Sequence, residues 1–355
     1  MLLVRFAQAL VRSAQASLPA YGTDFVLLLD ASLQDTAPEV AIAACGCCTS
    51  LASLMQRRIG VENALLLAER VTVQVGHGRA AVRLAALDAL HVLVLAGAHE
   101  HLLAMSAFLH PNRVNISAFY GKEPVHINWL GKLATDHNAG VRARLIAVLA
   151  DWMLNLRERV DHTPRLLPFM LSGLTDATDH VVDATTTALA ALGKAYVAEN
   201  ADRLADAVRF APNMDPNSIC ASLIIQDHLS ALLPPCLADM RAWTTDVRPR
   251  AVALLKALLI LAGPAVEQHI ATVTAALCNC IEDADPVVAQ TARDCCVAIA
   301  TNAAPDTFAA QLELLAQANA TRKQAITLLR LVCDAVDAET AGHCTYSDAL
   351  TRVLL

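Results

Sequence analysis

The chain has 355 residues and a formal charge of −7, and 55% of its residues are hydrophobic although only 4% are aromatic. An apolar content this high with so few rings means that Ala, Leu and Val fill the interior, which is typical of packed helices and not of a β-sandwich or barrel. The mild acidity and the lack of a Lys/Arg tract argue against nucleic acid or an anionic membrane as the main partner.

One pattern recurs along the chain: an apolar helix, a short turn that usually carries Asp, and then Val at the start of a second helix rich in Ala and Leu. In chain order these second helices begin at Val40, Val82, Val141, Val181, Val247 and Val287. Several of the intervals are close to about forty residues, the period of HEAT and armadillo repeats. We therefore predict an all-α fold, an α-solenoid (superhelix) of HEAT/armadillo-like helical hairpins.

The two longer intervals between these valines predict irregular insertions. Residues 97–121 and 211–222 hold them, since each contains a short segment of loop composition with Pro and Asn, namely residues 110–115 and 211–217. We expect residues 1–355 to form a single array of about seven repeats. The first and last helices, near Leu2 and Leu355, lack the polar outer face of a terminal cap, so the chain is predicted to be part of a longer array.

The turn residues have predicted roles in this array. The Asp of each turn is expected to cap the second helix with its carboxylate. The Val-Arg pairs, such as Val141-Arg142, are expected to place an apolar anchor inward and a cation outward. A single hairpin cannot bury its apolar face alone, so neighbouring hairpins stack and share one core.

Motifs that would carry chemistry are weak in this sequence. The eleven cysteines, several of them adjacent as in Cys45-Gly46-Cys47-Cys48, lack zinc-site or disulfide spacing and are interpreted as reduced core thiols. His99-Glu100-His101 falls short of HExxH because Leu103 stands where the second His belongs. No nucleophile elbow or phosphate loop occurs, so we predict no catalytic residue, no metal site and no cofactor.

Neither a membrane span nor a secretory signal is predicted. Charged residues such as Arg83 and Lys256 interrupt the apolar runs before they reach about 18 residues. The first residues also lack the basic, apolar, small-residue order of a signal peptide. We therefore expect a cytoplasmic protein with no membrane partner.

Candidate protein-binding residues cluster in the middle of the chain. The arginines from Arg142 to Arg165 alternate with acidic residues, which favours local ion pairs, but Arg and Trp are also enriched in interface hot spots. For each Trp the alternative is a buried anchor between repeats. The candidates are Trp152, Arg157, Arg159, Arg165, Trp243 and Arg248.

Three stretches of sequence identify a protein family more specifically than the repeat pattern does. Residues 151–159 (DWMLNLRER) precede residues 165–176 (RLLPFMLSGLTD), and residues 191–200 (ALGKAYVAEN) follow. In order and approximate spacing, the region from Asp151 to about Val288 resembles the dynein axonemal assembly factor 5 family. Members of that family are longer, which agrees with a partial array.

That resemblance implies a non-enzymatic cytoplasmic scaffold that helps to preassemble outer and inner dynein arms for motile cilia or flagella. The partners implied are axonemal dynein chains, chaperones and other dynein assembly factors. Two alternatives remain: a general HEAT-repeat adaptor in transport or as a phosphatase scaffold, and a metal-dependent enzyme built on helical repeats. A bound metal would favour the enzyme. The identity of the partners distinguishes the dynein assembly scaffold from the general adaptor.

Overall fold

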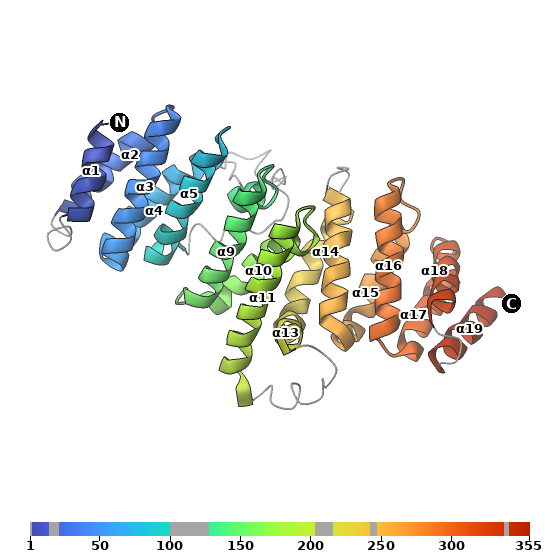
Figure 1. Ribbon diagram of the computed structural model, residues 1–355. Coiled ribbons are helices and arrows are strands. Elements are labelled where there is room, and N and C mark those ends of the chain that lie inside the picture. The colour runs from blue at the N-terminus through green and yellow to red at the C-terminus, as the bar shows by residue number, and fades with distance from the viewer. Residues whose placement is uncertain (1, 14–20, 100–127, 203–215, 242–246, 337–340) are drawn as a thin grey trace. The chain divides into compact units, whose positions relative to one another are not determined.

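The computed structural model describes residues 2–13, 21–99, 128–202, 216–241, 247–336 and 341–355 (Figure 1). Within these ranges every regular element is a helix and there is no strand, so the predicted all-α fold is confirmed. The chain divides into two compact units, Met1–Ala188 and Leu189–Leu355. Helix α11 (Asp179–Glu199) runs from the first unit into the second.

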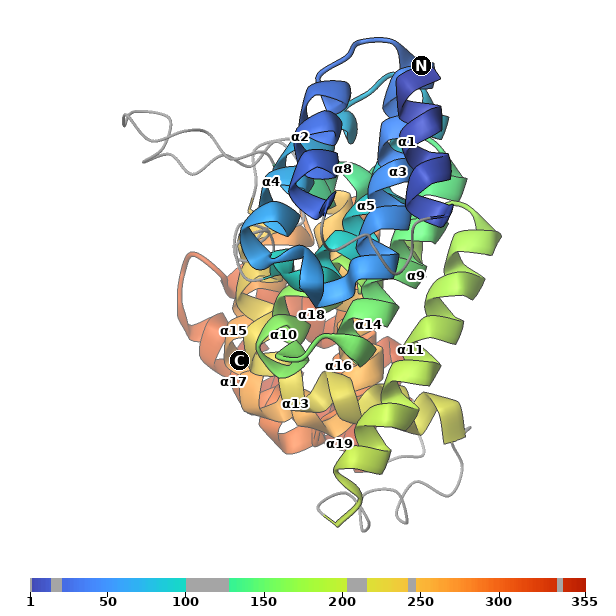
Figure 2. The ribbon, with the colours of Figure 1, turned by 90° about the vertical axis from the view of Figure 1, so that its left-hand side faces the viewer.

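The first unit is built of two layers of helices. Figure 2 shows α2 and α4 on one side of this unit and α1, α3 and α5 on the other. Each helix packs on the next helix of its own layer and on its hairpin partner, as HEAT-type hairpins do. The bounds are α1 (Leu2–Ser13), α2 (Gly22–Leu33), α3 (Pro38–Met55), α4 (Val61–Gln74), α5 (Ala80–Leu93), α8 (Trp129–Ala134), α9 (Ala139–Asn155) and α10 (Arg159–Leu171).

The second unit repeats this arrangement. Helices α14, α16 and α18 pack in sequence as one layer, and α15, α17 and α19 pack as the other. Helix α13 pairs with α14 in the first hairpin. The bounds are α13 (Pro216–Asp239), α14 (Val247–Ala262), α15 (Ile270–Cys280), α16 (Pro286–Asn302), α17 (Pro305–Gln317), α18 (Arg322–Ala335) and α19 (Ala341–Leu354).

Helix α9 shows how the sequence produces such an element. The side chain of Asn138 caps its first turn by accepting hydrogen bonds from the backbone N–H groups of Gly140 and Val141, at 2.9 and 3.3 Å. Val141, Leu145 and Trp152 recur at helical spacing on the buried side of the helix. This face anchors α9 between its neighbours in the first unit.

Small and medium apolar side chains fill the core, as the composition predicts. Buried Ala, Val, Leu and Cys predominate, and the few aromatic rings are local anchors, some of them in pairs such as Trp129–Trp152 and Phe308–Tyr346. The four largest side chains that are fully buried are Trp152, Tyr346, Phe169 and Phe308. Small residues at helix contacts allow the close approach that a stack of hairpins needs.

Four helical stretches have the length and composition of a membrane span: Pro38–Ile59, Ala80–Ala98, Ile219–Asp239 and Val247–Cys280. Between 44% and 56% of each stretch is buried inside the fold. Each belongs to the layers described above and packs its apolar side against other helices. The expectation that charged residues such as Arg83 and Lys256 interrupt the apolar runs too early for a span is therefore wrong, because both residues lie within these stretches.

The first predicted insertion falls largely outside the described residues, and most of the second is part of a helix, contrary to the prediction. Of residues 97–121, only the short π-helical turn that ends at Ala98 and the adjacent His99 are described. Of residues 211–222, those from Pro216 onward belong to α13. Residue Gly97 in the π-helical turn has a φ of 135°, which only glycine adopts readily, so the chain bends there.

Candidate interaction site

The turn between the two helices of a repeat is organised by one aspartate. Its Oδ1 accepts a hydrogen bond from the backbone N–H two residues later, an Asx turn that fixes the direction of the chain. Four turns share this bond, at 2.8 to 2.9 Å, formed by Asp35, Asp136, Asp176 and Asp283. The local sequence therefore sets the angle between the paired helices.

The expectation that this aspartate caps the second helix is wrong. In two turns the cap lies two residues further on, where Asn138 accepts from the start of α9 and Asp285 accepts from the N–H of Val287 at 2.8 Å. The physical reason is that the aspartate stands two residues before the N-cap and its carboxylate accepts the N–H of that N-cap residue instead, as for Asp35, Asp136 and Asp283.

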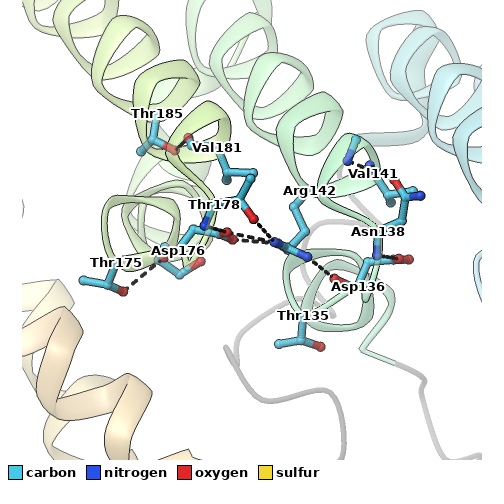
Figure 3. Close-up of polar contacts among 12 residues, drawn as sticks. Thr135, Asp136, Asn138, Val141, Arg142, Thr175, Asp176, Thr178, Val181 and Thr185 are labelled. Atoms are coloured by element: carbon cyan, nitrogen blue, oxygen red, sulfur yellow. Dashed lines mark hydrogen bonds and ion pairs between the residues drawn. The ribbon is translucent and has the colours of Figure 1, made fainter.

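The side chain of Arg142 binds one of these turn aspartates, and it does not point into solvent as the sequence suggested. Its Nε lies 2.6 Å from Asp176 Oδ2 and its Nη2 lies 2.8 Å from Asp176 Oδ1, in the turn of the next repeat. Its Nη1 also donates to the backbone carbonyl of Asp136 at 2.5 Å. Figure 3 shows Arg142 lying between these two turns.

Arg83 has the same two-pronged geometry and reaches Asp136 at 2.5 and 2.7 Å. A third pair is looser: Arg248 donates one hydrogen bond, from Nη2 to Asp283 Oδ1 at 3.1 Å, and its Nε lies 3.0 Å from Oδ2 in an ion pair. We call these three pairs, Arg83–Asp136, Arg142–Asp176 and Arg248–Asp283, the turn ladder. Two of them lie in the first unit and the third lies in the second unit. A guanidinium that grips a carboxylate through two bonds fixes both distance and orientation between neighbouring repeats.

The ladder pairs are largely shielded from water. The side chains of Arg142 and Asp176 are 16% and 10% exposed. Burial alone would raise the pKa of Asp176, but hydrogen bonds from Arg142 and Thr178 outweigh it, and this pKa lies below its ordinary value. The bond to Asp176 also raises the pKa of Arg142. Both groups therefore keep their charges at neutral pH.

One turn of the first unit has neither member of the pair. His77 takes the place of the aspartate, and its Nδ1 accepts from the N–H of Arg79 at 3.0 Å. In the preceding helix α3, the position of the ladder arginine is occupied by buried Ala41. Because arginine and carboxylate are missing together, no unpaired charge is left buried at this junction.

The structure also shifts the repeat register by one residue in α16. Val287, which the sequence pattern selected, is 60% exposed, whereas Val288 is fully buried. Asp283 and the cap Asp285 stand at the same distances before Val288 as Asp136 and Asn138 do before Val141. Val288 is thus the buried anchor equivalent to Val141. The sequence pattern selected Val287 instead because the two valines are adjacent.

More exposed ion pairs join neighbouring helices of one layer, away from the turns. Arg144 contacts Asp88 at 2.7 Å, and Nε2 of His91 lies 2.7 Å from Asp151, so α5 and α9 are linked twice. In the second unit, Lys256 of α14 contacts Asp294 of α16 at 2.8 Å. Of the alternating charges seen in the sequence, Arg142, Arg144 and Asp151 form ion pairs, and these pairs join different repeats instead of the local neighbours expected.

The six predicted binding residues occupy very different positions. Trp152 is fully buried, and its indole N–H donates to the carbonyl of His91 at 3.1 Å, so this residue anchors α9 against α5. Arg248 belongs to the turn ladder. Both residues therefore act on the fold itself, and Trp243 lies outside the described residues.

Of the remaining three arginines, Arg157 and Arg159 lie at the junction between α9 and α10, and Arg165 lies in the middle of α10. Arg157 and Arg165 are exposed, and Arg159 is partly buried at the first position of α10. Beside them Val160 is 71% exposed, the highest value among the large internal apolar side chains of the described ranges. Arginine next to exposed apolar surface is the chemistry of a protein contact, so this junction is the candidate interaction site.

The cysteines behave as buried apolar residues. All eleven are free, and eight of them are buried. Burial raises the pKa of Cys45 to about 12 and that of Cys278 to about 11, so these thiols stay protonated and unreactive at neutral pH. The prediction of core thiols agrees with this placement.

Comparison with known proteins yields two family models that together span most of the chain. The model described as "Dynein axonemal assembly factor 5-like, TPR repeats" matches residues 1–110 and 124–207. The model described as "Dynein axonemal assembly factor 5, HEAT-repeat domain" matches residues 210–341.

Similar proteins and structures were also found. Dynein axonemal assembly factor 5 of Mus musculus is 24% identical over 86% of this chain and 34% of its own length, and that of Homo sapiens is 27% identical over 47% of this chain and 21% of its own length. The chain thus spans about a third or less of these relatives. Among solved structures, importin β (TM-score 0.44) and yeast importin β (TM-score 0.43) are each 14% identical, over 94% and 98% of this chain and 44% and 45% of theirs.

Proposed function

The chain belongs to the dynein axonemal assembly factor 5 family, and from this premise we propose that it is a scaffold for the cytoplasmic preassembly of axonemal dynein arms. The observation that carries the proposal is the match of two family models from residue 1 to residue 341. On this proposal the protein serves outer and inner arm assembly during the building of motile cilia or flagella. Its partners are axonemal dynein chains, chaperones and other assembly factors.

The geometry supports a binding role. Stacked hairpins fixed by the turn ladder present rigid, extended rows of helices, and such rows hold large clients by many separate contacts. Rigid scaffolding lowers the ordering entropy that a docking surface loses when a client binds. The role needs no reaction centre.

We propose that Arg157, Arg159 and Arg165 contact a client directly, at the junction between α9 and α10 and on α10 itself. Two observations support this: Arg157 and Arg165 are exposed, and the exposed Val160 adds apolar area beside them. Trp152 and Arg248 would support client binding indirectly, by holding the stack in register.

Affinity capture from cells that build motile cilia tests the function, with non-ciliated cells as the comparison. The expected result is that tagged chain retains axonemal dynein chains and chaperones only from the ciliated cells. Capture of partners unrelated to cilia from both cell types, without dynein chains, would support a general HEAT-repeat adaptor instead.

A paired variant tests the site. Replacing Arg157 and Arg165 by Glu is expected to reduce captured dynein chains at least about tenfold, as expected for the loss of hot-spot cations. Replacing Arg57 and Arg58, which are exposed at the end of α3, is the matched control for changing two surface arginines. Equal capture by both variants would remove the α9–α10 junction from the interface.

A further inference from the structure

Two histidines that are far apart in sequence meet inside the first unit. His99 follows the π-helical turn after α5, and His162 lies on α10, yet their ring centroids are only 5.5 Å apart with the ring planes at 87°. The bend at Gly97 directs the chain so that His99 arrives at α10. The sequence analysis considered His99 only as part of an incomplete HExxH motif and did not single out His162.

The ring nitrogens of this pair lack hydrogen-bond partners. His162 is 6% exposed, and neither of its ring nitrogens is bonded, nor is the buried Nδ1 of His99. A buried polar atom without a partner costs about 1–3 kcal/mol, so such a group usually has a partner or a ligand. Three unbonded nitrogens at one place therefore point to a ligand that accepts imidazole lone pairs.

The separation of the rings fits a shared metal ion. A Zn–N bond is about 2.1 Å and an imidazole nitrogen lies about 1.1 Å from the ring centre, so two imidazoles on one tetrahedral zinc have centroids roughly 5 Å apart. The observed 5.5 Å agrees with this value. Co-ligating rings can adopt any angle between their planes, and 87° is therefore compatible.

We propose that His99 and His162 form a two-histidine site for a divalent transition-metal ion of the zinc class. Among the described residues, no third His, Cys, Asp or Glu completes a group of metal ligands. Within the described part of the chain, the remaining coordination positions are open to water or to a donor from a bound molecule. Such a site binds less tightly than a closed structural zinc site, and a ligand from a partner would strengthen it.

Metal titration of the full chain tests the site. After removal of metal with EDTA and transfer to chelator-free buffer at pH 7.5, Zn²⁺ is titrated calorimetrically and Co²⁺ is followed by its absorption spectrum. We expect saturable binding of one equivalent. Each of His99→Ala and His162→Ala should weaken that binding at least about tenfold. His180→Ala is the matched control, because His180 is an exposed histidine on α11 of the same unit, and it should leave binding unchanged.

A measurement on the unaltered chain guards against variants that do not fold. In a ¹H–¹⁵N spectrum of the imidazole nitrogens, Zn²⁺ should shift the signals of two of the twelve histidines. Absence of saturable binding, binding that survives the double variant, or shifts confined to other histidines would overturn the proposal. Metal binding is measured without any client, so its outcome is separate from that of the assembly function.

Discussion

At the scale of single residues, the ladder pair Arg142–Asp176 is the interaction between two side chains whose loss is expected to affect stability most. Each partner neutralises a largely buried charge of the other, and Arg142 also binds the carbonyl of the turn before it. Removing one partner leaves the other charged and poorly solvated, which costs more than the bond itself contributes.

We therefore expect Asp176→Ala to lower the free energy of unfolding by about 2–4 kcal/mol, and Arg142→Ala to lower it by a similar amount. The double variant should be less destabilised than the sum, because it leaves no orphaned charge. Denaturant unfolding of the four proteins measures both quantities. Arg79→Ala is the control, since Arg79 and Glu39 are 62% and 61% exposed and their pair should contribute under about 1 kcal/mol. Equal losses for Arg79→Ala and Arg142→Ala would contradict the role of burial.

A second expectation at this scale concerns pH and His162. Its pKa in the folded chain lies below the ordinary value of 6.5 because of burial, so the folded state binds fewer protons than the unfolded state below about pH 6.5. The stability that the neutral ring contributes is fully present above that pH and is lost as the pH falls toward the lowered pKa. His228 is shifted in the same direction by burial and adds to the effect.

Unfolding free energies measured at pH 7.5 and 5.5, in EDTA, should thus decrease toward acid, and less so in His162→Gln than in the parent chain. His180→Gln, which alters an exposed ring, should keep the full decrease. If His162→Gln and the parent chain lost the same free energy, the pH dependence would have another source.

At the scale of elements, the contact between α11 and α13 depends on one glycine. A Cβ at Gly193 would overlap the backbone of Cys220 and Ala221, and backbone atoms cannot move aside as a flexible side chain can. Tyr196 and Val197 of α11 pack next to this point against Ile219 and Leu223 of α13. The two helices can make this apolar contact only if the crossing is close.

Gly193→Ala should therefore destabilise the chain by about 1–3 kcal/mol, through overpacking, despite the better helix propensity of Ala. Gly78→Ala is the matched control, because nothing lies within 4 Å of a Cβ at that position and its backbone has no positive φ. Thermal unfolding measures the difference, and a neutral or stabilised Gly193→Ala would show that the helices separate at low cost.

How far the sequence predicts these elements depends on the range of the interaction. The period of about forty residues and the anchor Val141 identify the hairpins, because helix amphipathicity and turn chemistry are local. The bond from Arg142 to Asp176 was missed, since it joins two repeats and no local pattern distinguishes a paired arginine from a solvated one. The one-residue shift to Val288 and the meeting of His99 with His162 likewise depend on tertiary packing.

At the scale of the whole molecule, a repeat array transmits disturbance mainly to nearest neighbours, because each hairpin contacts only the next. In Arg142→Ala, amide hydrogen exchange should rise in α9, α10 and the turns beside them, and remain close to that of the parent chain in α17 to α19. Arg352→Ala, which removes an exposed contact to Glu313 in the second unit, should show the reverse pattern. Mass spectrometry of exchanged peptides resolves the two regions, and a uniform rise along the chain would indicate one cooperative block.

The joint absence of both ladder partners at the junction of Ala41 and His77 has a consequence for how such chains diverge. If substitution removes only the arginine or only the aspartate, the remaining charge is buried without a partner and the chain is strongly destabilised. The two positions are therefore expected to change together, as they have at Ala41 and His77. Among relatives, the positions of Arg142 and Asp176 should therefore covary: a relative should either keep both charged residues or have neutral residues at both positions.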